Sequence, residues 1–528
     1  MSVLASVLLA VTIVAHDPGY TTSLANHLKR WLGAEGVAAN VVTPSAMKAA
    51  LKNERLAFLV GFSSPSKSEI ETLRSFRSRG GKMVVFHSAS PALADMMGVK
   101  PVGYASAPYP GSWSRMDFST TFPEGMPRTI RQSSAVLQRA RPVKGKARVI
   151  ATWADRSGKS TGEPAWIASS SGYWMTHVLQ ADGDEDMKAR LLGAIVGSIN
   201  PKAWNYASHK ARVDASAAVM RQLALKQVPL RGEIHAVWDQ SGCGLYPGNW
   251  PLTIKVLRES RVTDLFVNFA GAAFAHYPSS VLPRSKTFEQ EGDQIAACLA
   301  AAKASGIRVH AWMICFSATR GTAERMDIFQ RKGWRLKATN GKYTEYLDPS
   351  LADVRLYVLS AVDEMQSRYP QLNGIHLDFV RWGDSAIKPK NAASYVSAFV
   401  SDARRRVKRP RWLTTAVYGK YPQCVASVGQ DWYGWLNSGI VDYVVPMDYT
   451  QSMPVLDSLF RQHASPKSHA RRTIVGLGVT ANESRLNAAD VIAQIGLSRR
   501  YGFAGVALFD LDVTLEKSIL PYLRLGMW

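Results

Sequence analysis

Residues 373–382, Asn-Gly-Ile-His-Leu-Asp-Phe-Val-Arg-Trp, contain the pattern from which the architecture of this chain can be worked out. The mostly apolar run at 373–377 predicts a buried parallel strand, and Asp378 follows at its end. His376 precedes Asp378 by two positions, so both side chains leave the strand on the same side. Arg381 comes three residues after Asp378. A carboxylate directly after a buried strand is typical of a catalytic position in a parallel α/β barrel.

Apolar segments of similar length recur on both sides of this stretch, with helical patterns between them. Together they form a set of about eight candidate strands, at 234–238, 264–269, 307–312, 373–377, 412–417, 442–446, 473–477 and 504–509. This alternation predicts an α/β fold in which residues 230–528 form a closed (β/α)₈ TIM barrel.

The N-terminal part of the chain shows a second alternation of strands and helices. Its candidate strands lie at 11–15, 41–42, 56–60, 83–86, 148–153 and 173–179. This pattern predicts a flavodoxin-like, doubly wound parallel sheet over residues 1–201. Residues 202–229 are expected to form a bridging helix and linker. A chain of 528 residues is long enough for two such domains.

The net charge indicates which classes of partner to expect, and the cysteine content bears on metal sites and disulfides. The net charge of +23 favours anionic partners, such as nucleic acid, anionic lipid or acidic polysaccharide. No nucleic-acid-binding module accompanies the scattered Lys and Arg residues, so no nucleic-acid partner is expected. Four widely spaced cysteines match neither a zinc motif nor a disulfide-rich scaffold, and a disulfide between Cys243 and Cys424 stays open.

No transmembrane segment is predicted. The apolar opening, residues 1–15, lacks the basic start of a secretory signal and is too short to span a bilayer. No later apolar segment is long enough to do so.

Polar and aromatic residues follow the other predicted barrel strands as well. The C-terminal ends of barrel strands lie on one face, so these side chains are expected to surround one cleft. They are Trp238 and Asp239 after the first strand, Asn268 in the second, Trp312 in the third, Asp448 and Tyr449 after the sixth, Glu483 after the seventh and Asp510 after the eighth.

Over about 230–528 the chain resembles bacterial glycosyl-hydrolase-like family 10, a barrel family of glycosidases. The matching stretches include Ala236-Val237-Trp238, Tyr277-Pro278-Ser279, Val309-His310-Ala311-Trp312, Gly374-Ile375-His376-Leu377-Asp378, Gln430-Asp431-Trp432, Val445-Pro446-Met447-Asp448-Tyr449 and Gly505-Val506-Ala507-Leu508-Phe509. The resemblance implies a glycoside hydrolase and marks Asp378. The chain departs from the family pattern at Asp348, where members often carry Asn, and at Asp448, where other polar residues are frequent.

The N-terminal domain resembles the class I glutamine-amidotransferase-like domains that accompany several glycosidase barrels. Such a domain would carry its nucleophilic cysteine after the strand at 83–86, where this chain has His87-Ser88-Ala89-Ser90. Ser88 beside His87 is a weak candidate nucleophile. The resemblance therefore implies an accessory domain.

Glycosidic cleavage requires two carboxyl groups that face one cleft. Asp378 is the first candidate, and the partner is left open between Glu483 and Asp448, with Asp510 third. Arg381 is expected to lower the pKa of Asp378 and so to favour its ionised form.

The other residues at the barrel mouth are expected to bind substrate. Indole rings stack on the apolar faces of sugars. No His–x–Glu or paired-His spacing accompanies the acidic residues, so neither a metal nor a cofactor is expected. The candidate substrate-binding residues are Trp238, Asp239, Asn268, Trp312, His376, Arg381, Trp382, Trp432, Tyr449 and Asp510.

These patterns predict a glycoside hydrolase that acts on a polymeric or oligomeric glycan containing amino sugars, such as peptidoglycan strands or mucin-type glycans. The positive charge would favour an anionic glycan. The alternative is a non-catalytic glycan-binding protein on the same barrel, which only an activity measurement separates from an enzyme. An extracytoplasmic location follows from the substrate class and the apolar opening.

Overall fold

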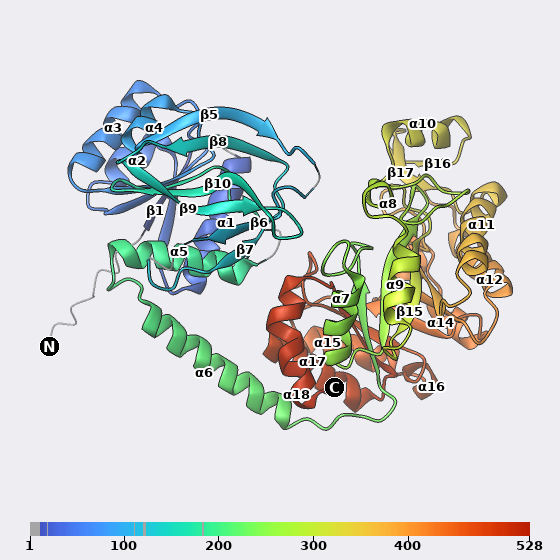
Figure 1. The fold of residues 1–528 in the computed structure, drawn as a ribbon. Coiled ribbons are helices and arrows are strands. Elements are labelled where there is room, and N and C mark those ends of the chain that lie inside the picture. Colours follow the sequence, from blue (N-terminus) through green and yellow to red (C-terminus); the bar gives the residue numbers. More distant parts are fainter. Residues whose placement is uncertain (1–10, 18, 110, 120–122, 182–183) are drawn as a thin grey trace. The chain divides into compact units, whose positions relative to one another are not determined.

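The computed structural model describes residues 11–17, 19–109, 111–119, 123–181 and 184–528, so the apolar opening at 1–10 lies outside the described residues. The chain divides into two compact units, Met1–Ala217 and Ala218–Trp528. The division falls inside helix α6 (Tyr206–Leu225), which lies within the predicted linker. Figure 1 shows the first unit in blue to green and the second in green to red.

The second unit is a closed barrel of parallel strands, as predicted. Neighbouring strands pair in parallel around the whole circle, and β12 pairs with both β13 and β22, which closes the sheet. The strands, in chain order, are β12 (Ile234–Asp239), β13 (Asp264–Gly271), β15 (Arg308–Ile314), β18 (Gly374–Asp378), β19 (Trp412–Tyr418), β20 (Tyr443–Met447), β21 (Ile474–Gly478) and β22 (Gly505–Phe509). A short strand, β14 (Phe274–Ala275), pairs antiparallel to β13.

Helices alternate with these strands and bury their apolar sides against them. Side-chain caps define where several begin: Ser452 caps α15, and Asn487 forms a capping box with Asp490 at α17. The helices are α7 (Trp250–Glu259), α8 (Lys286–Glu291), α9 (Gln294–Ala302), α10 (Ala323–Arg331), α11 (Ala352–Arg368), α12 (Ala392–Arg406), α13 (Gln423–Val428), α14 (Trp432–Asn437), α15 (Met453–His463), α16 (Lys467–Ala470), α17 (Ala488–Tyr501) and α18 (Leu520–Gly526), with a π-helical turn at Leu515–Ile519 and a hairpin of β16 (Arg335–Lys337) and β17 (Tyr343–Leu347).

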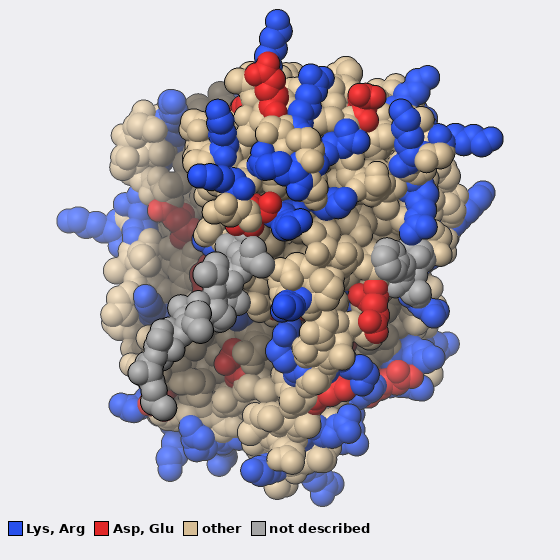
Figure 2. Space-filling view, turned by 90° about the vertical axis from the view of Figure 1, so that its left-hand side faces the viewer, with Lys and Arg blue, Asp and Glu red and all other residues tan. Residues whose placement is uncertain are grey.

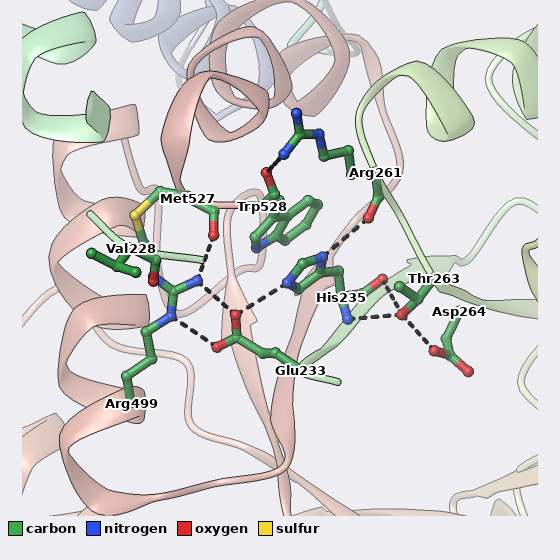
Figure 3. Close-up of polar contacts among 9 residues, drawn as sticks. All are labelled: Val228, Glu233, His235, Arg261, Thr263, Asp264, Arg499, Met527 and Trp528. Carbon is green, nitrogen blue, oxygen red and sulfur yellow. Dashed lines mark hydrogen bonds and ion pairs between the residues drawn. The ribbon is translucent and has the colours of Figure 1, made fainter. Parts of the chain in front are cut away.

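A buried ion pair lies at the N-terminal end of the barrel, shown in Figure 3. Arg499 of α17 donates to both carboxylate oxygens of Glu233, at 2.6 and 3.0 Å. The His235 ring contacts the same carboxylate at 3.1 Å and stacks on Trp528, with ring centroids 4.7 Å apart. Arg261 donates to the carbonyl of Trp528. These contacts fix strand β12 at the end of the barrel opposite Asp378.

The first unit contains a sheet whose parallel part follows the predicted strands. In spatial order this part comprises β2 (Ala39–Val42), β1 (Val11–Ala15), β3 (Leu56–Val60), β4 (Lys82–Phe86) and β11 (Gly172–Met175). The sheet continues with antiparallel strands: β10 (Ser160–Ser169), β9 (Ala147–Ala154), β6 (Arg115–Phe118) and β7 (Thr129–Arg131). Of these, β9 corresponds to the predicted strand at 148–153, although its antiparallel pairing was not predicted, and the other three strands were not predicted. A separate hairpin pairs β5 (Val99–Ser106) with β8 (Val136–Pro142).

Helices pack on both faces of the parallel part. Ile13 and Phe58 lie in one apolar cluster with residues of α1 (Tyr20–Ala34) and α5 (Glu185–Ile199). Their neighbours Val14 and Leu59 lie in another with residues of α2 (Pro44–Ala50), α3 (Lys67–Ser78) and α4 (Pro91–Met96). The flavodoxin-like and amidotransferase-like description stays a prediction, because antiparallel strands form the other part of this sheet.

On the face shown in Figure 2, positive charge is spread over several areas rather than gathered in one patch. Figure 2 shows Lys and Arg side chains over most of the visible face, with fewer Asp and Glu side chains among them. Among the described residues, no helix is both long enough and apolar enough to cross a membrane.

Candidate active site

A cavity of about 520 Å³ opens at the C-terminal ends of the barrel strands. This is the end at which TIM barrels carry their binding and catalytic groups. The predicted site residues that line it are Trp238, Trp312, Asp378, Arg381, Tyr449 and Glu483. The structure therefore brings one of the proposed carboxyl pairs into a single cavity, together with aromatic rings.

Asp378 ends strand β18 and is 5% exposed. The indole N–H of Trp312 donates to its Oδ2 at 3.2 Å, and the backbone N–H of Phe379 donates to its Oδ1 at 2.6 Å. Burial raises the pKa of Asp378 above its ordinary value, although Arg381 and these two donors act to lower it. The net direction is opposite to the one predicted from Arg381 alone, because loss of hydration outweighs a guanidinium that lies 3.9 Å away.

Phe379 adopts a left-handed backbone conformation, with φ of 48°. Such a φ is strained for a bulky side chain and is found mostly where the surroundings enforce it. Here the conformation accompanies the donation of the Phe379 N–H to Asp378 and the packing of its ring against the guanidinium of Arg381, 3.9 Å from the ring centroid. One strained residue thus contacts both Asp378 and Arg381.

Glu483 and Tyr449 approach the cavity from other strands. Glu483 lies in the loop after β21 and is exposed, whereas Tyr449 follows β20 and stacks on Phe509, with ring centroids 5.4 Å apart. Burial raises the pKa of Tyr449 well above its ordinary value, and the negative charges of Asp378, Asp510 and Glu483 add to this effect. The Tyr449 hydroxyl therefore keeps its proton and offers a hydrogen-bond donor.

Trp238 lines the cavity and is anchored from below by His376. The indole N–H of Trp238 donates to His376 Nε2 at 3.0 Å, and His376 Nδ1 contacts Thr414 Oγ1 at 2.8 Å. Burial lowers the pKa of His376 well below its ordinary value, so the ring is neutral and able to accept from Trp238. His376 does not line the cavity, and its contacts are those of a residue that fills the barrel interior rather than one that binds substrate.

Asp448 does not line the cavity, in contrast to its predicted role. Its carboxylate faces the buried ring of His463, with both oxygens 3.1 Å from His463 Nε2. It also lies against Gly419, where any β-carbon would overlap Asp448 Oδ1. The side chain is buried behind the cavity wall and paired with His463, so it is a poor candidate for the second carboxyl group.

Asp239 and Asp510 organise the loops beside the cavity. Asp239 accepts hydrogen bonds from the backbone N–H groups of Ser241, Gly242 and Gly244. Asp510 accepts from the backbone N–H of Gln240 at 3.0 Å. Burial, reinforced by the charge of Asp239, raises the pKa of Asp510 to about 8. Neither carboxyl group lines the cavity.

Three other predicted substrate-binding residues lie away from the cavity. Asn268 is fully buried in β13, and neither of its side-chain polar atoms has a hydrogen-bond partner. Trp382 packs among Leu336 and Ala392. Trp432 is 0% exposed and donates its indole N–H to the Tyr418 carbonyl. These two indoles pack in the core and do not line the cavity.

Tyr418 and Lys420 line the cavity and were missed by the sequence analysis. Tyr418 ends strand β19, and no predicted site residue lies at the end of this strand. Its ring centroid lies 4.5 Å from Arg381 Cζ. Lys420 is exposed. The strand-end rule that selected Asp378 also applies to Tyr418, so the signal was present in the sequence.

The structure also bears on the candidate disulfide, the candidate nucleophile Ser88 and metal binding. Cys424 lines the cavity as a free thiol, so the disulfide with Cys243 is not formed. In the first unit, Ser88 is 0% exposed and donates to the Phe62 carbonyl, which is unfavourable for a nucleophile. Within the described residues, no group of three or more His, Cys, Asp or Glu side chains is arranged to hold a metal ion.

No family model and no curated protein matches the chain. Solved structures resemble parts of it. The PgaB (BpsB) glycoside hydrolase domain from Bordetella bronchiseptica is 12% identical over 55% of this chain and 98% of that chain, with a TM-score of 0.42. The Bacillus cereus spore cortex-lytic enzyme SleL is 10% identical over 57% of this chain and 75% of its own, with a TM-score of 0.38.

A ThuA-like protein from Bacteroides uniformis is 11% identical over 38% of this chain and 96% of its own, with a TM-score of 0.31. At such identities and TM-scores the similarities carry no argument about activity. Membership in bacterial glycosyl-hydrolase-like family 10 therefore stays a prediction.

Proposed function

We propose that the barrel is a glycoside hydrolase in which Asp378 and Glu483 form the catalytic carboxyl pair. The observation that carries this proposal is that both groups line one cavity, which is also lined by Trp238, Trp312 and Tyr449. Carboxyl groups supply the acid and base of glycosidic cleavage, and aromatic rings stack on sugar faces. A cavity that combines both is suited to a sugar substrate.

The environments of the two carboxyl groups support a division of roles between them. Burial favours the protonated form of Asp378, and the N–H groups of Trp312 and Phe379 hold its orientation. Asp378 therefore donates a proton to the glycosidic oxygen as that bond breaks. Glu483 is exposed at the cavity, where it attacks the anomeric carbon or removes a proton from the attacking water.

The substrate we propose is a polymeric or oligomeric glycan that contains amino sugars, such as peptidoglycan strands or mucin-type glycans. The net charge of +23 supports an anionic polymer, which the surface would attract at long range. We propose that the first unit is an amidotransferase-like accessory domain. Because the proposed substrate lies outside the cytoplasm, we also propose that the protein acts there.

The test is product release from a panel of purified glycans, including peptide-free peptidoglycan strands and mucin O-glycans, analysed by mass spectrometry. Wild type should release fragments from at least one glycan, and Asp378→Asn and Glu483→Gln should each lower the rate by about 10²–10⁴-fold. Asp457→Asn, on the surface of α15, is the matched control and should retain the wild-type rate.

If wild type binds a glycan of the panel but cleaves none of them, the glycan-binding alternative replaces the hydrolase. If Asp378→Asn is as active as wild type, the proposed acid is wrong whatever the substrate.

A further inference from the structure

Arg381 is a buried cation on the cavity wall, and two of its three side-chain nitrogen atoms have no hydrogen-bond partner in the protein. Its side chain is 6% exposed, and neither Nε nor Nη1 has a hydrogen-bond partner. The two nearest carboxylates, Asp378 at 3.9 Å and Asp384 at 4.0 Å, lie beyond hydrogen-bonding distance. Buried donors without a partner are destabilising and are rare in folded proteins.

Two aromatic rings hold this guanidinium in place. The Arg381 Cζ atom lies 3.9 Å from the ring centroid of Phe379 and 4.5 Å from that of Tyr418. Cation–π contacts of this kind stabilise the charge while leaving the N–H groups in the guanidinium plane unused. The group is therefore fixed before substrate arrives, and less conformational entropy is lost on binding.

The charge of Arg381 is also poorly compensated. Asp384 is 43% exposed, so solvent screens its charge, and burial favours the neutral form of the other neighbour, Asp378. Lys420 adds a second, exposed cation to the same cavity. A ligand that brings a negative charge into the cavity would compensate the buried positive charge of Arg381.

We propose that Arg381 determines specificity by binding a carboxylate carried by the sugar that occupies the cavity, so that the substrate is a carboxylated rather than a neutral glycan. A planar guanidinium matches a carboxylate in shape and forms paired hydrogen bonds with it. Uronic acids and sugars with a lactyl ether carry such a group. The inference rests on the proposed glycosidase function and names its substrate class.

The experiment compares two substrates that differ only in this group: peptide-free peptidoglycan strands with their carboxylates free, and the same strands with the carboxylates reduced to alcohols. Wild type should cleave the carboxylated strands with a kcat/KM at least about 10-fold higher. Arg381→Met should lose about 10-fold or more on the carboxylated strands and discriminate poorly between the two. Arg381→Lys, which keeps the charge, should retain part of the preference.

Lys420→Met is the matched control, because it removes an exposed cation from the same cavity. Its effect on the carboxylated strands should fade as salt is raised, whereas the effect of Arg381→Met should persist, since buried charges are less screened. Thermal unfolding of each variant shows whether it is folded. Equal cleavage of both substrates by wild type, or an equal loss on both in Arg381→Met, would overturn the inference.

Failure of the proposed function has a different signature. If wild type cleaves neither polymer, binding of both is measured by isothermal titration calorimetry in Asp378→Asn, with and without Arg381→Met. A preference for carboxylated strands that disappears with Arg381 would sustain the carboxylate site without the hydrolase. Equal affinities, or no binding of either polymer, would reject the site as well.

Discussion

Burial and Arg381 act on the pKa of Asp378 in opposite directions: burial raises it and the charge of Arg381 lowers it. If Asp378 is the general acid, activity falls as pH rises through its pKa and the proton is lost. Removing the positive charge in Arg381→Met should raise this pKa further and move the alkaline limb of the kcat/KM profile to higher pH. Lys420→Met should leave the limb unmoved, and an unchanged limb in Arg381→Met would contradict the assignment of Asp378 as the acid.

Asp510 makes a separate prediction about stability. Its pKa is raised from 3.8 to about 8 by burial and by Asp239. The folded state therefore binds more protons than the unfolded state between these values, so this contribution to stability is full below about pH 4 and is lost as pH rises through about 8. Asp510→Asn keeps the acceptor for Gln240 but cannot ionise.

Urea unfolding of Asp510→Asn at pH 5 and pH 8 tests this. Relative to wild type, the variant should gain at least about 1 kcal/mol at pH 8 compared with pH 5, since one pKa unit corresponds to about 1.4 kcal/mol. Parallel losses of stability in the two proteins would show that Asp510 is not the group responsible.

The sequence could predict which residues stand at the cavity edge but not where each side chain turns. Asp378, Trp312 and Glu483 follow their strands into the cavity. Asp448 obeys the same strand-end rule, yet it turns towards His463, which lies fifteen residues later in α15. Trp432 likewise turns into the core. Such choices depend on partners that are distant in sequence, and no local pattern reports them.

At the scale of elements, the barrel strands were predictable because parallel strands buried on both faces form nearly continuous apolar runs. The antiparallel strands of the first unit were predicted only at β9. In the separate hairpin, strand β5 alternates half-buried and exposed positions, and the pairing of β9 with β10 contains register shifts. Alternation and bulges weaken the apolar signal and leave pairing direction undetermined from sequence.

The ion pair beneath the barrel provides a test of how β12 and α17 are joined. Glu233 and Arg499 have side chains 3% and 10% exposed. Burial alone would raise the pKa of Glu233, but hydrogen bonds from His235 and Arg499 outweigh it and the pKa is lowered. Glu233→Gln leaves a buried cation without its partner and should cost about 3–5 kcal/mol in urea unfolding.

The double variant Glu233→Met/Arg499→Met should be less destabilised than Glu233→Gln, because it buries no unpaired charge. Asp457→Asn breaks the exposed pair with Arg461 and should cost less than about 1 kcal/mol. Glu233→Met and Arg499→Met are also measured singly. If the double variant loses the sum of these two effects, the two residues act independently. The stability that depends on ionised Glu233 should vanish as pH falls below its lowered pKa.

At the scale of the whole molecule, each unit has its own apolar core: among the described residues, the clusters around Ile13 and Val14 belong to the first unit and the barrel clusters to the second. We therefore expect calorimetry to resolve two unfolding transitions. Leu59→Ala, which removes a side chain 0% exposed in β3, should cost about 2–5 kcal/mol and lower only one of them. Glu233→Gln should lower only the other. A single transition that both substitutions shift would mean that the two units unfold together. The free energy of unfolding of the barrel could then not be measured separately from that of the first unit.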